Sequence, residues 1–167
     1  MRRQVDHHLA RARAVGRLGH SQSRALVWGS LESVERAVSR LYAHVRIDMA
    51  GDKAIAARVE RQDLDEMLGN LIENAAKYGG GSVFVTVSDA GDFVEIAIED
   101  DGQGIPESER ERLFDRGARL DTGKPGTGLG LAIVRDVVEI YGGTVALEES
   151  EDLGGLLVRL RLPRALG

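Results

Sequence analysis

Two stretches of alternating apolar and polar residues lie close together near the middle of this 167-residue chain. Valine or isoleucine occupies every second position over 83–87 and again over 94–98, and a turn-forming stretch at 89–92 separates the two runs. A period of two places the apolar side chains of each strand on one face, and aspartate with glycine favours a tight turn. The pattern predicts a β-hairpin, so the chain must contain an antiparallel sheet with one face that needs a cover.

Apolar spacing elsewhere predicts the elements that pack with this hairpin. Helical periodicity bounded by glycine predicts helices at 3–17, 30–44, 62–78, 107–113 and 129–141. Short β-type runs predict further strands near 45–49, 57–60, 144–149 and 156–162. Because helices and hairpin-linked strands alternate along the chain, we expect an α+β fold with a mixed sheet and helices over one of its faces.

Composition restricts the class of protein. Hydrophobic residues make up 43% of the chain and charged residues 29%, which is typical of a globular domain. The chain has no cysteine, which excludes disulfide scaffolds, thiol catalysis and cysteine–zinc sites. No apolar run approaches the roughly 18 residues of a membrane span, so we expect a soluble, cytoplasmic domain.

Charge is distributed unevenly along the chain. Residues 1–24 contain six arginines and a single acidic residue, whereas the whole chain has a net charge of −5, so the remainder is strongly acidic. Nucleic-acid binding needs a concentrated positive surface, which an acidic domain does not offer. The basic start is typical of the solvated side of a helix, with a nucleic-acid arm or a membrane-proximal segment as alternatives.

The helix predicted over 63–78 has two distinct faces. Its apolar residues form a broad arc, while Asn70, Asn74 and Lys77 fall at i, i+4 and i+7 and form a narrow polar stripe. An amide oxygen can bind Mg²⁺ when phosphates supply most of the other ligands, and a lysine ammonium attracts phosphate oxygens. Taken alone, such a stripe is more typical of an ordinary solvated face.

Acidic residues and spaced glycines follow the second strand of the hairpin. The stretch 98–106 contains Asp100, Gly102 and Gly104, and glycine permits backbone conformations and close approaches that other residues do not. A carboxylate at this place could accept a hydrogen bond from an exocyclic amine, as on adenine. By itself, the stretch is better explained as a β-turn with solvated acids.

A second group of glycines lies before the last predicted helix, in a chain whose 21 glycines exceed the roughly 12 of average usage. Residues 123–131 are glycine-rich, and the N–H groups at such a helix start can bind an anion. The segment is not a Walker A loop, because Pro125 follows Lys124, and its glycine spacing does not match the dinucleotide fingerprint. It is therefore a candidate phosphate site that matches neither common nucleotide-binding fold.

In this order, the three segments resemble the N, G1 and G2 boxes of the sensor histidine kinase catalytic domain. Residues 112–117 lie between the second and third segments and resemble the F box, and the run 114–122 is most similar to sensor kinases of the PhoQ type. This family shares an ATP-binding superfamily with DNA gyrase, the heat-shock 90 chaperones and MutL. The resemblance covers residues 24–163.

The resemblance implies a fold and a domain organisation. The fold would be α+β, a two-layer α/β sandwich (the Bergerat fold), in which a mixed sheet of about five strands has about three helices on one face and a mobile ATP lid spans 115–127. Residues 1–18 would be a remnant of the second helix of a dimerisation and phosphoacceptor hairpin. Residues 19–23 would be a linker, and 24–167 the catalytic ATP-binding domain.

The resemblance also implies roles for the residues at the box positions. Asn74 would be the Mg²⁺ ligand, and Asp100 would accept the hydrogen of the adenine amino group, with Tyr78 beside the ring. The implied catalytic residues are Asn70, Lys77, Arg119 and Lys124. The other residues implied to contact ATP are Gly102, Gly104, Ile105, Phe114, Gly126, Thr127, Gly128, Leu129 and Gly130.

Position 70 distinguishes a kinase from an ATPase within this superfamily. The ATPases carry a glutamate there as the general base that activates water, and the amide of Asn70 cannot take a proton. The resemblance therefore implies transfer of the γ-phosphoryl group of Mg–ATP to a histidine on a separate upstream domain, for relay to a response regulator. A superfamily ATPase or conformational switch and a non-catalytic nucleotide-binding docking module are the alternatives.

None of the four histidines precedes an acidic residue, so the phosphoacceptor motif is missing. We therefore expect this sequence to be part of a longer, homodimeric sensor kinase with its acceptor helix and membrane segments upstream, in the inner or plasma membrane of a bacterium. The implied cofactors are ATP and Mg²⁺. The implied partners are the upstream phosphoacceptor domain and a response regulator, and no nucleic acid.

Overall fold

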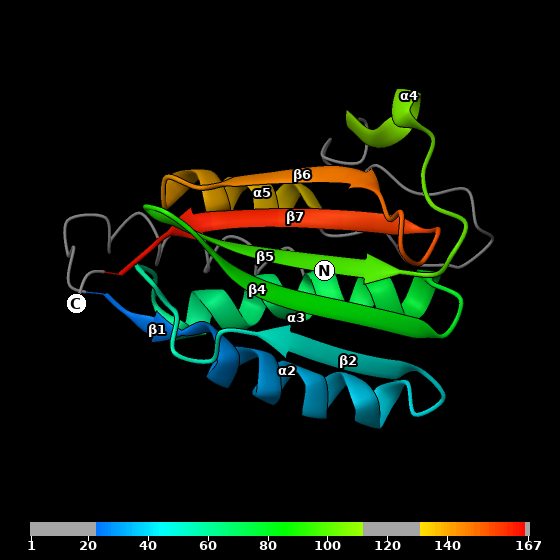
Figure 1. Cartoon of the computed structure of the whole chain (residues 1–167), viewed down its shortest axis with the longest axis horizontal. Coiled ribbons are helices and arrows are strands. Elements are labelled where there is room, and N and C mark those ends of the chain that lie inside the picture. Colours follow the sequence, from blue (N-terminus) through cyan, green and yellow to red (C-terminus); the bar gives the residue numbers. More distant parts are fainter. Residues whose placement is uncertain (1–22, 112–130, 166–167) are drawn as a thin grey trace.

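Three helices cover one face of a five-stranded sheet in the computed structural model, which describes residues 23–111 and 131–165 (Figure 1). The strands of this sheet are β2 (Arg46–Gly51), β4 (Ser82–Ala90), β5 (Phe93–Asp100), β6 (Thr144–Glu149) and β7 (Leu156–Pro163). The three helices are α2 (Val27–Leu41), α3 (Arg61–Tyr78) and α5 (Leu131–Ile140). The short α4 (Glu107–Arg110) stands apart from the helical layer. The predicted α+β, two-layer architecture is confirmed.

The sheet is mixed, and its order is β2-β4-β5-β7-β6. β2 and β4 are parallel because α3 crosses between them, and the other neighbouring strands are antiparallel. The central hairpin differs from the prediction in its turn. β4 and β5 extend to Ala90 and Phe93, so two residues rather than four connect them, and Gly91 makes this possible with a φ of +77°.

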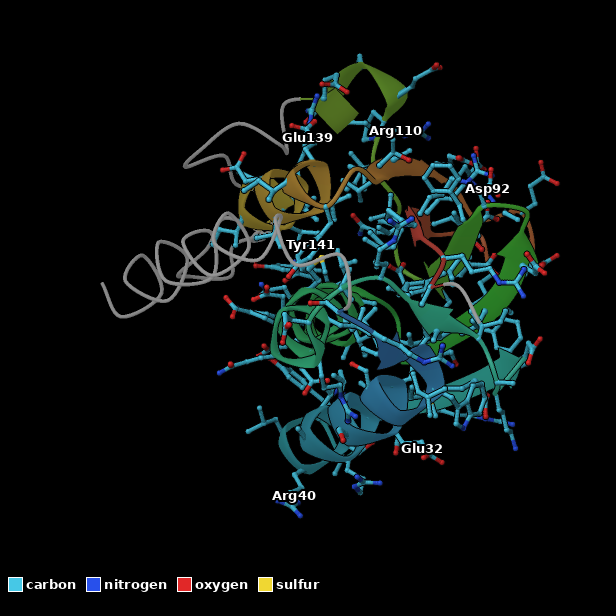
Figure 2. The ribbon with its side chains drawn as sticks, turned by 90° about the vertical axis from the view of Figure 1, so that its left-hand side faces the viewer. Glu32, Arg40, Asp92, Arg110, Glu139 and Tyr141 are labelled. Carbon is cyan, nitrogen blue, oxygen red and sulfur yellow. The ribbon has the colours of Figure 1, made fainter. Side chains whose placement is uncertain are left out.

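The core lies between the sheet and the helices. The alternation of β4 and β5 buries Val83, Val85 and Val87 together with Ile96 and Ile98, as the period of two predicts. Seen from the side, α3 lies between α2 and α5, and all three lie on the same side of the strands (Figure 2). α3 therefore contacts the sheet and both other helices.

Two differences from the predicted elements have simple physical reasons. α2 begins three residues earlier than expected, because Val27 and Leu31 are spaced one turn apart and both are fully buried. A two-stranded ribbon, β1 (Ala25–Leu26) with β3 (Ala56–Ala57), was not predicted, and β3 stands where a strand over 57–60 was expected. Strands of two residues are too short to show a periodic pattern.

Some of the predicted elements cannot be compared with the structure. The helix at 3–17, the assignment of 1–18, and nearly all of the linker at 19–23 lie outside the described residues, as do the end of the 107–113 helix and the start of the 129–141 helix. Over 23–111 and 131–165, no helix combines the length and apolarity needed to cross a bilayer.

Charged side chains occupy the sheet face opposite the helices. Arg159 of β7 lies between Glu95 of β5 and Glu148 of β6, with its Nε 2.9 Å from a Glu148 carboxylate oxygen. The hydrogen bond from Arg159 lowers the pKa of Glu148 below its ordinary value of 4.5. This row of alternating charge lets a sheet face without a helical cover remain in contact with water.

Candidate functional site

A pocket of about 810 Å³ opens between the C-terminal half of α3, the end of β5 and the start of β7. Its walls include Leu71, Asn74, Ala75 and Tyr78 of α3, Ile98 to Ile105 except Glu99, Leu131 of α5, and Leu156 and Val158 of β7. These segments are far apart in the sequence, and the fold brings them together. The wall combines apolar side chains with several polar groups, a mixture that can orient a small molecule as well as bury it.

The wall formed by α3 follows from the periodicity of that helix. The apolar arc packs into the core, and Leu71 and Ala75 form part of the pocket wall where the arc reaches its C-terminal end. Asn74 and Tyr78, one turn apart, also line the pocket. The helix ends at Tyr78, and the N–H of the following Gly79 donates to the Ala75 carbonyl at 2.9 Å. The end of the helix therefore places an amide and an aromatic ring beside the pocket.

Asp100, the last residue of β5, is the buried acid of the pocket, with 7% of its surface exposed. Its Oδ1 accepts hydrogen bonds from the Gly102 N–H at 2.9 Å and the Leu156 N–H at 3.3 Å. Burial raises the pKa of Asp100 above its ordinary 3.8, and the nearby Asp101 adds to this, against the two N–H groups that lower it. The second oxygen, Oδ2, has no donor within the described part of the chain.

The loop between β6 and β7, residues 150–155, packs closely against Asp100; we call it the β6–β7 loop. Gly155 donates its N–H to the Asp100 carbonyl at 3.1 Å. A Cβ atom at position 155 would lie 2.3 Å from Asp100 Oδ1, so a larger residue would displace the loop or the carboxylate. Glycine at 155 therefore allows the loop to reach the acid.

Asp101 connects the two sides of the pocket. Its Oδ1 accepts hydrogen bonds from the Gly80 N–H at 2.9 Å and the Ser82 N–H at 3.0 Å. These bonds tie the end of β5 to the glycine turn that follows α3. The position of Asp100 relative to Tyr78 is thus supported by hydrogen bonds as well as by packing.

The structure brings together only some of the residues that the sequence pointed to. Those that line the pocket are Asn74, Tyr78, Asp100, Gly102, Gly104 and Ile105. Asn70 is not on its wall and lies instead in a small cleft between α3 and α5, with Asp63 and Val134. Lys77 is also not on the wall, and its ammonium lies 5.5 Å from the centroid of the Tyr78 ring.

The remaining predicted site residues belong to the segment 112–130, which is outside the described residues. They are Phe114, Arg119, Lys124, Gly126, Thr127, Gly128, Leu129 and Gly130. Their assignments stay predictions.

Sequence reasoning missed the contribution of β7. Leu156 and Val158 line the pocket, and Leu156 also donates its backbone N–H to Asp100. The signal in the sequence is a pair of glycines, Gly154 and Gly155, directly before an apolar strand. That signal alone could not locate the strand, because the pairing of β5 with β7 joins residues more than fifty positions apart.

The geometry indicates what the pocket can bind. Asp100 is a buried carboxylate that lines the pocket and has one oxygen without a donor in the described part of the chain. Such a group can accept a hydrogen bond from an amine on a flat ligand. Among residues 23–111 and 131–165 there is no cluster of three or more His, Cys or acidic residues able to hold a metal ion.

Comparison with known families agrees with this arrangement. Residues 59–166 match the family model described as histidine kinase-, DNA gyrase B- and HSP90-like ATPase. The matched stretch begins two residues before α3 and contains all the elements that form the pocket.

A curated relative supports the same family. The two-component sensor PhoQ of Pseudomonas aeruginosa is 37% identical over 165 residues, which is 96% of this chain and 36% of that protein. The chain spans about a third of the length of the curated relatives it matches.

Two solved structures share the fold. The mycobacterial sensor histidine kinase MprB superposes with a TM-score of 0.79 at 25% identity, covering 87% of this chain and all of that one. The ATP-binding domain of PrrB from Mycobacterium tuberculosis superposes with a TM-score of 0.72 at 31% identity, covering 85% and 96%. The chain thus belongs to the histidine kinase-, DNA gyrase B- and HSP90-like ATPase family, and it contains an ATP-binding catalytic domain of the sensor histidine kinase type.

Proposed function

We propose that the pocket between α3, β5 and β7 binds the adenine end of ATP, with Asp100 as the acceptor for the 6-amino group. The observation that supports this is the state of the Asp100 carboxylate, which is buried, with Oδ1 bound to two backbone N–H groups and Oδ2 without a donor in the described structure. An amino group on the ligand would satisfy that oxygen. Tyr78 and Ile105 on the wall would contact the flat ring.

The proposal includes Mg²⁺ held partly by Asn74. Its side chain lines the pocket, and a carboxamide oxygen is a ligand that Mg²⁺ accepts. The absence of an acidic or histidine cluster from the described residues fits an ion that takes most of its ligands from phosphates and water. When bound, Mg²⁺ would offset negative charge on the phosphate oxygens. Lys77, Arg119 and Lys124 are the cationic residues that we propose to act beside the phosphates.

The proposed reaction is transfer of the γ-phosphoryl group to a histidine nitrogen supplied by another domain of a longer protein. Such transfer depends mainly on positioning and electrostatics, which this chain would supply by binding the nucleotide. Asn70 bears an amide, which cannot act as the base that activates water. A kinase is therefore favoured over an ATPase.

The longer protein would be a homodimeric, membrane-anchored bacterial sensor that passes the phosphoryl group to a response regulator. Support comes from the name of the Pseudomonas relative, a two-component sensor, and from the share of its length that the chain spans. We propose residues 1–18 as the end of the phosphoacceptor hairpin and 24–167 as the catalytic domain.

A two-stage experiment tests the function. Calorimetry first measures whether the chain binds ATP and whether Mg²⁺ strengthens binding. The chain is then incubated with γ-labelled ATP and the purified phosphoacceptor domain of the Pseudomonas relative. We expect the label on the acceptor and none on the chain, and we expect Asn74→Ala to lose the effect of Mg²⁺. Steady ADP release without an acceptor would favour an ATPase instead, and label on His7 or His8 would contradict an acceptor on another domain.

A further inference from the structure

Glu99 and Ser150 form a buried hydrogen bond beside the pocket but outside it. Ser150 donates its hydroxyl to Glu99 Oε1 at 2.9 Å, and the two residues are 0% and 6% exposed. Glu99 directly precedes Asp100, and because side chains alternate along β5, it points to the opposite face of the sheet. Burying a carboxylate costs free energy unless it is hydrogen-bonded. We therefore ask what this buried pair does for the pocket.

Ser150 organises the β6–β7 loop. Its N–H donates to the Gly155 carbonyl and its carbonyl accepts from the Gly154 N–H, both at 2.8 Å. Its hydroxyl oxygen also accepts from the Leu153 N–H at 3.0 Å. One residue thus holds the loop in shape through its backbone and fastens it to β5 through its side chain.

The far end of the same loop reaches Asp100. Gly155 packs against the Asp100 carboxylate, and the next residue, Leu156, donates its N–H to Oδ1. A continuous set of contacts therefore runs from Glu99 through Ser150 and the loop to the neighbouring Asp100. Glu99 and Asp100 thus contact the two ends of the β6–β7 loop, one on each face of the sheet.

We propose that the Glu99–Ser150 pair is a positioning pair, which holds the β6–β7 loop against Asp100 and thereby sets the preference of the pocket for a purine that bears a 6-amino group. The proposal rests on the proposed function, because it deepens the role of the adenine contact. Hydrogen bonds suit this task better than apolar packing would, since their direction specifies where the loop must lie.

The chain provides a matched control for this pair. Ser39 donates its hydroxyl to Glu35 at 2.8 Å within α2, which is the same chemical pair on a helix that does not line the pocket. Ser39→Ala and Ser150→Ala each remove a serine–glutamate hydrogen bond, so Ser39→Ala controls for the loss of that type of bond. Ser150→Ala also removes the acceptor of the Leu153 N–H, which the Glu99 substitutions leave in place.

The test compares two nucleotides that differ at a single group. Dissociation constants are measured by calorimetry for ATP and for purine riboside triphosphate, which lacks the 6-amino group. In Ser150→Ala we expect ATP to bind about tenfold more weakly, as for loss of one charge-assisted hydrogen bond, and purine riboside triphosphate to change less than about threefold. The preference for the amine should shrink accordingly, while Ser39→Ala keeps the preference of the unmodified chain.

Two substitutions at Glu99 test the acceptor of this hydrogen bond. Glu99→Leu removes the acceptor of the Ser150 hydroxyl and should lower the preference for the amine as Ser150→Ala does. We call these two the breaking variants, and Glu99→Leu replaces Ser150→Ala if the latter does not fold. Glu99→Gln retains an oxygen that can accept from Ser150, so we expect it to keep most of the preference. A general loss of stability would weaken both nucleotides equally and would not produce this pattern.

Asp100→Asn separates failure of this proposal from failure of the proposed function. If Asp100→Asn removes the preference for the amine but the folded breaking variants retain it, the positioning role is overturned and the adenine contact stands. If Asp100→Asn leaves the preference unchanged, the adenine contact itself is wrong, and the positioning role falls with it.

Discussion

Two buried carboxylates lie near opposite ends of α3 and are held in different ways. Asp63, in the first turn, is fully buried, and its Oδ2 accepts from the Tyr141 hydroxyl at 2.5 Å. Tyr141 follows α5, and in Figure 2 its label lies between α5 and α3. Asp100, near the C-terminal end, binds two N–H groups through one oxygen and has no donor for the other within the described residues.

The difference shows how the same chemical group serves the fold in one place and a ligand in another. The carboxylate of Asp63 joins two helices and lies at a helix N-terminus, where the helix dipole favours a negative charge. The carboxylate of Asp100 carries the cost of burial without a full set of partners, as its raised pKa indicates. We therefore expect changes at Asp63 to alter stability and changes at Asp100 to alter binding.

The largest effect should come from Asp63→Ala. It removes the buried hydrogen bond between Asp63 and the Tyr141 hydroxyl, and we expect the free energy of unfolding to fall by about 3 kcal/mol, with ATP affinity of the folded protein unchanged. Urea unfolding measures the first quantity and calorimetry the second. Asp48→Ala is the control, because Asp48 is 53% exposed and paired with Arg46 on the surface. Equal losses in the two variants would remove the distinction between buried and exposed carboxylates.

Asp100→Asn should lower ATP affinity and leave stability unchanged or higher, which is the reverse of the result expected for Asp63→Ala. The amide oxygen can still accept from Gly102 and Leu156, but its NH₂ group would face an amine, so we expect ATP affinity to fall roughly 30-fold, or about 2 kcal/mol. Since burial disfavours the charged form of Asp100, the neutral variant should be at least as stable as the unmodified chain without nucleotide. A variant with lower stability and unchanged affinity would contradict the contrast with Asp63.

Stability and ATP affinity should depend on pH in opposite directions because of Asp100. The folded pKa of Asp100 is raised above 3.8, so its contribution to stability is present below 3.8 and is lost as the pH rises through the folded pKa. ATP affinity should change in the opposite direction and fall by up to about tenfold per pH unit below the folded pKa, because protonation removes the acceptor. Titrations of the unmodified chain and of Asp100→Asn under identical conditions isolate this effect, since the titration of ATP itself is common to both. An identical pH profile in the two proteins would rule out Asp100 as the titrating group.

The smallest effect is expected at Glu148, a partly exposed carboxylate on the other face of the sheet. Its side chain is 44% exposed and paired with Arg159, and such pairs contribute about 0.2–1 kcal/mol. Because the pKa of Glu148 is lowered, this contribution is present above pH 4.5 and is lost as the pH falls through the folded pKa. Glu148→Gln should therefore lower the unfolding free energy slightly at pH 7, and the difference should vanish in acid. If Glu148→Gln lowered the unfolding free energy as much as Asp63→Ala does, burial would not explain the difference between these carboxylates.

The parts of the fold that could be predicted are those whose signals are local. α3 was expected at 62–78 and spans Arg61–Tyr78, because a long apolar period ends at a run of glycines. β6 was expected at 144–149 and spans Thr144–Glu149. The start of α2 was missed because an early glycine hides its first turn, and the β1–β3 ribbon was missed because two-residue strands have no period.

The same limit applies to the site. Asn74 and Asp100 could be singled out because each belongs to a short pattern of neighbouring residues, whereas Tyr78 came only from the family resemblance. All three line the pocket. Leu156 and the Glu99–Ser150 pair depend on how distant strands pair, which spacing along the chain does not reveal. Asn70 shares the polar stripe with Asn74, but one turn of helix places it in a different cleft.

The position of β7 between β5 and β6 has a consequence for how the protein is made. β7 is the last strand along the described chain, yet it completes the sheet from the inside and supplies part of the pocket wall and a donor to Asp100. A growing chain that has left the ribosome only as far as β6 has the hairpin and α3 but an unfinished pocket. A ligand stabilises only the states that bind it. ATP therefore cannot stabilise the early intermediates that form during synthesis. It can stabilise the domain only after β7 has paired between β5 and β6.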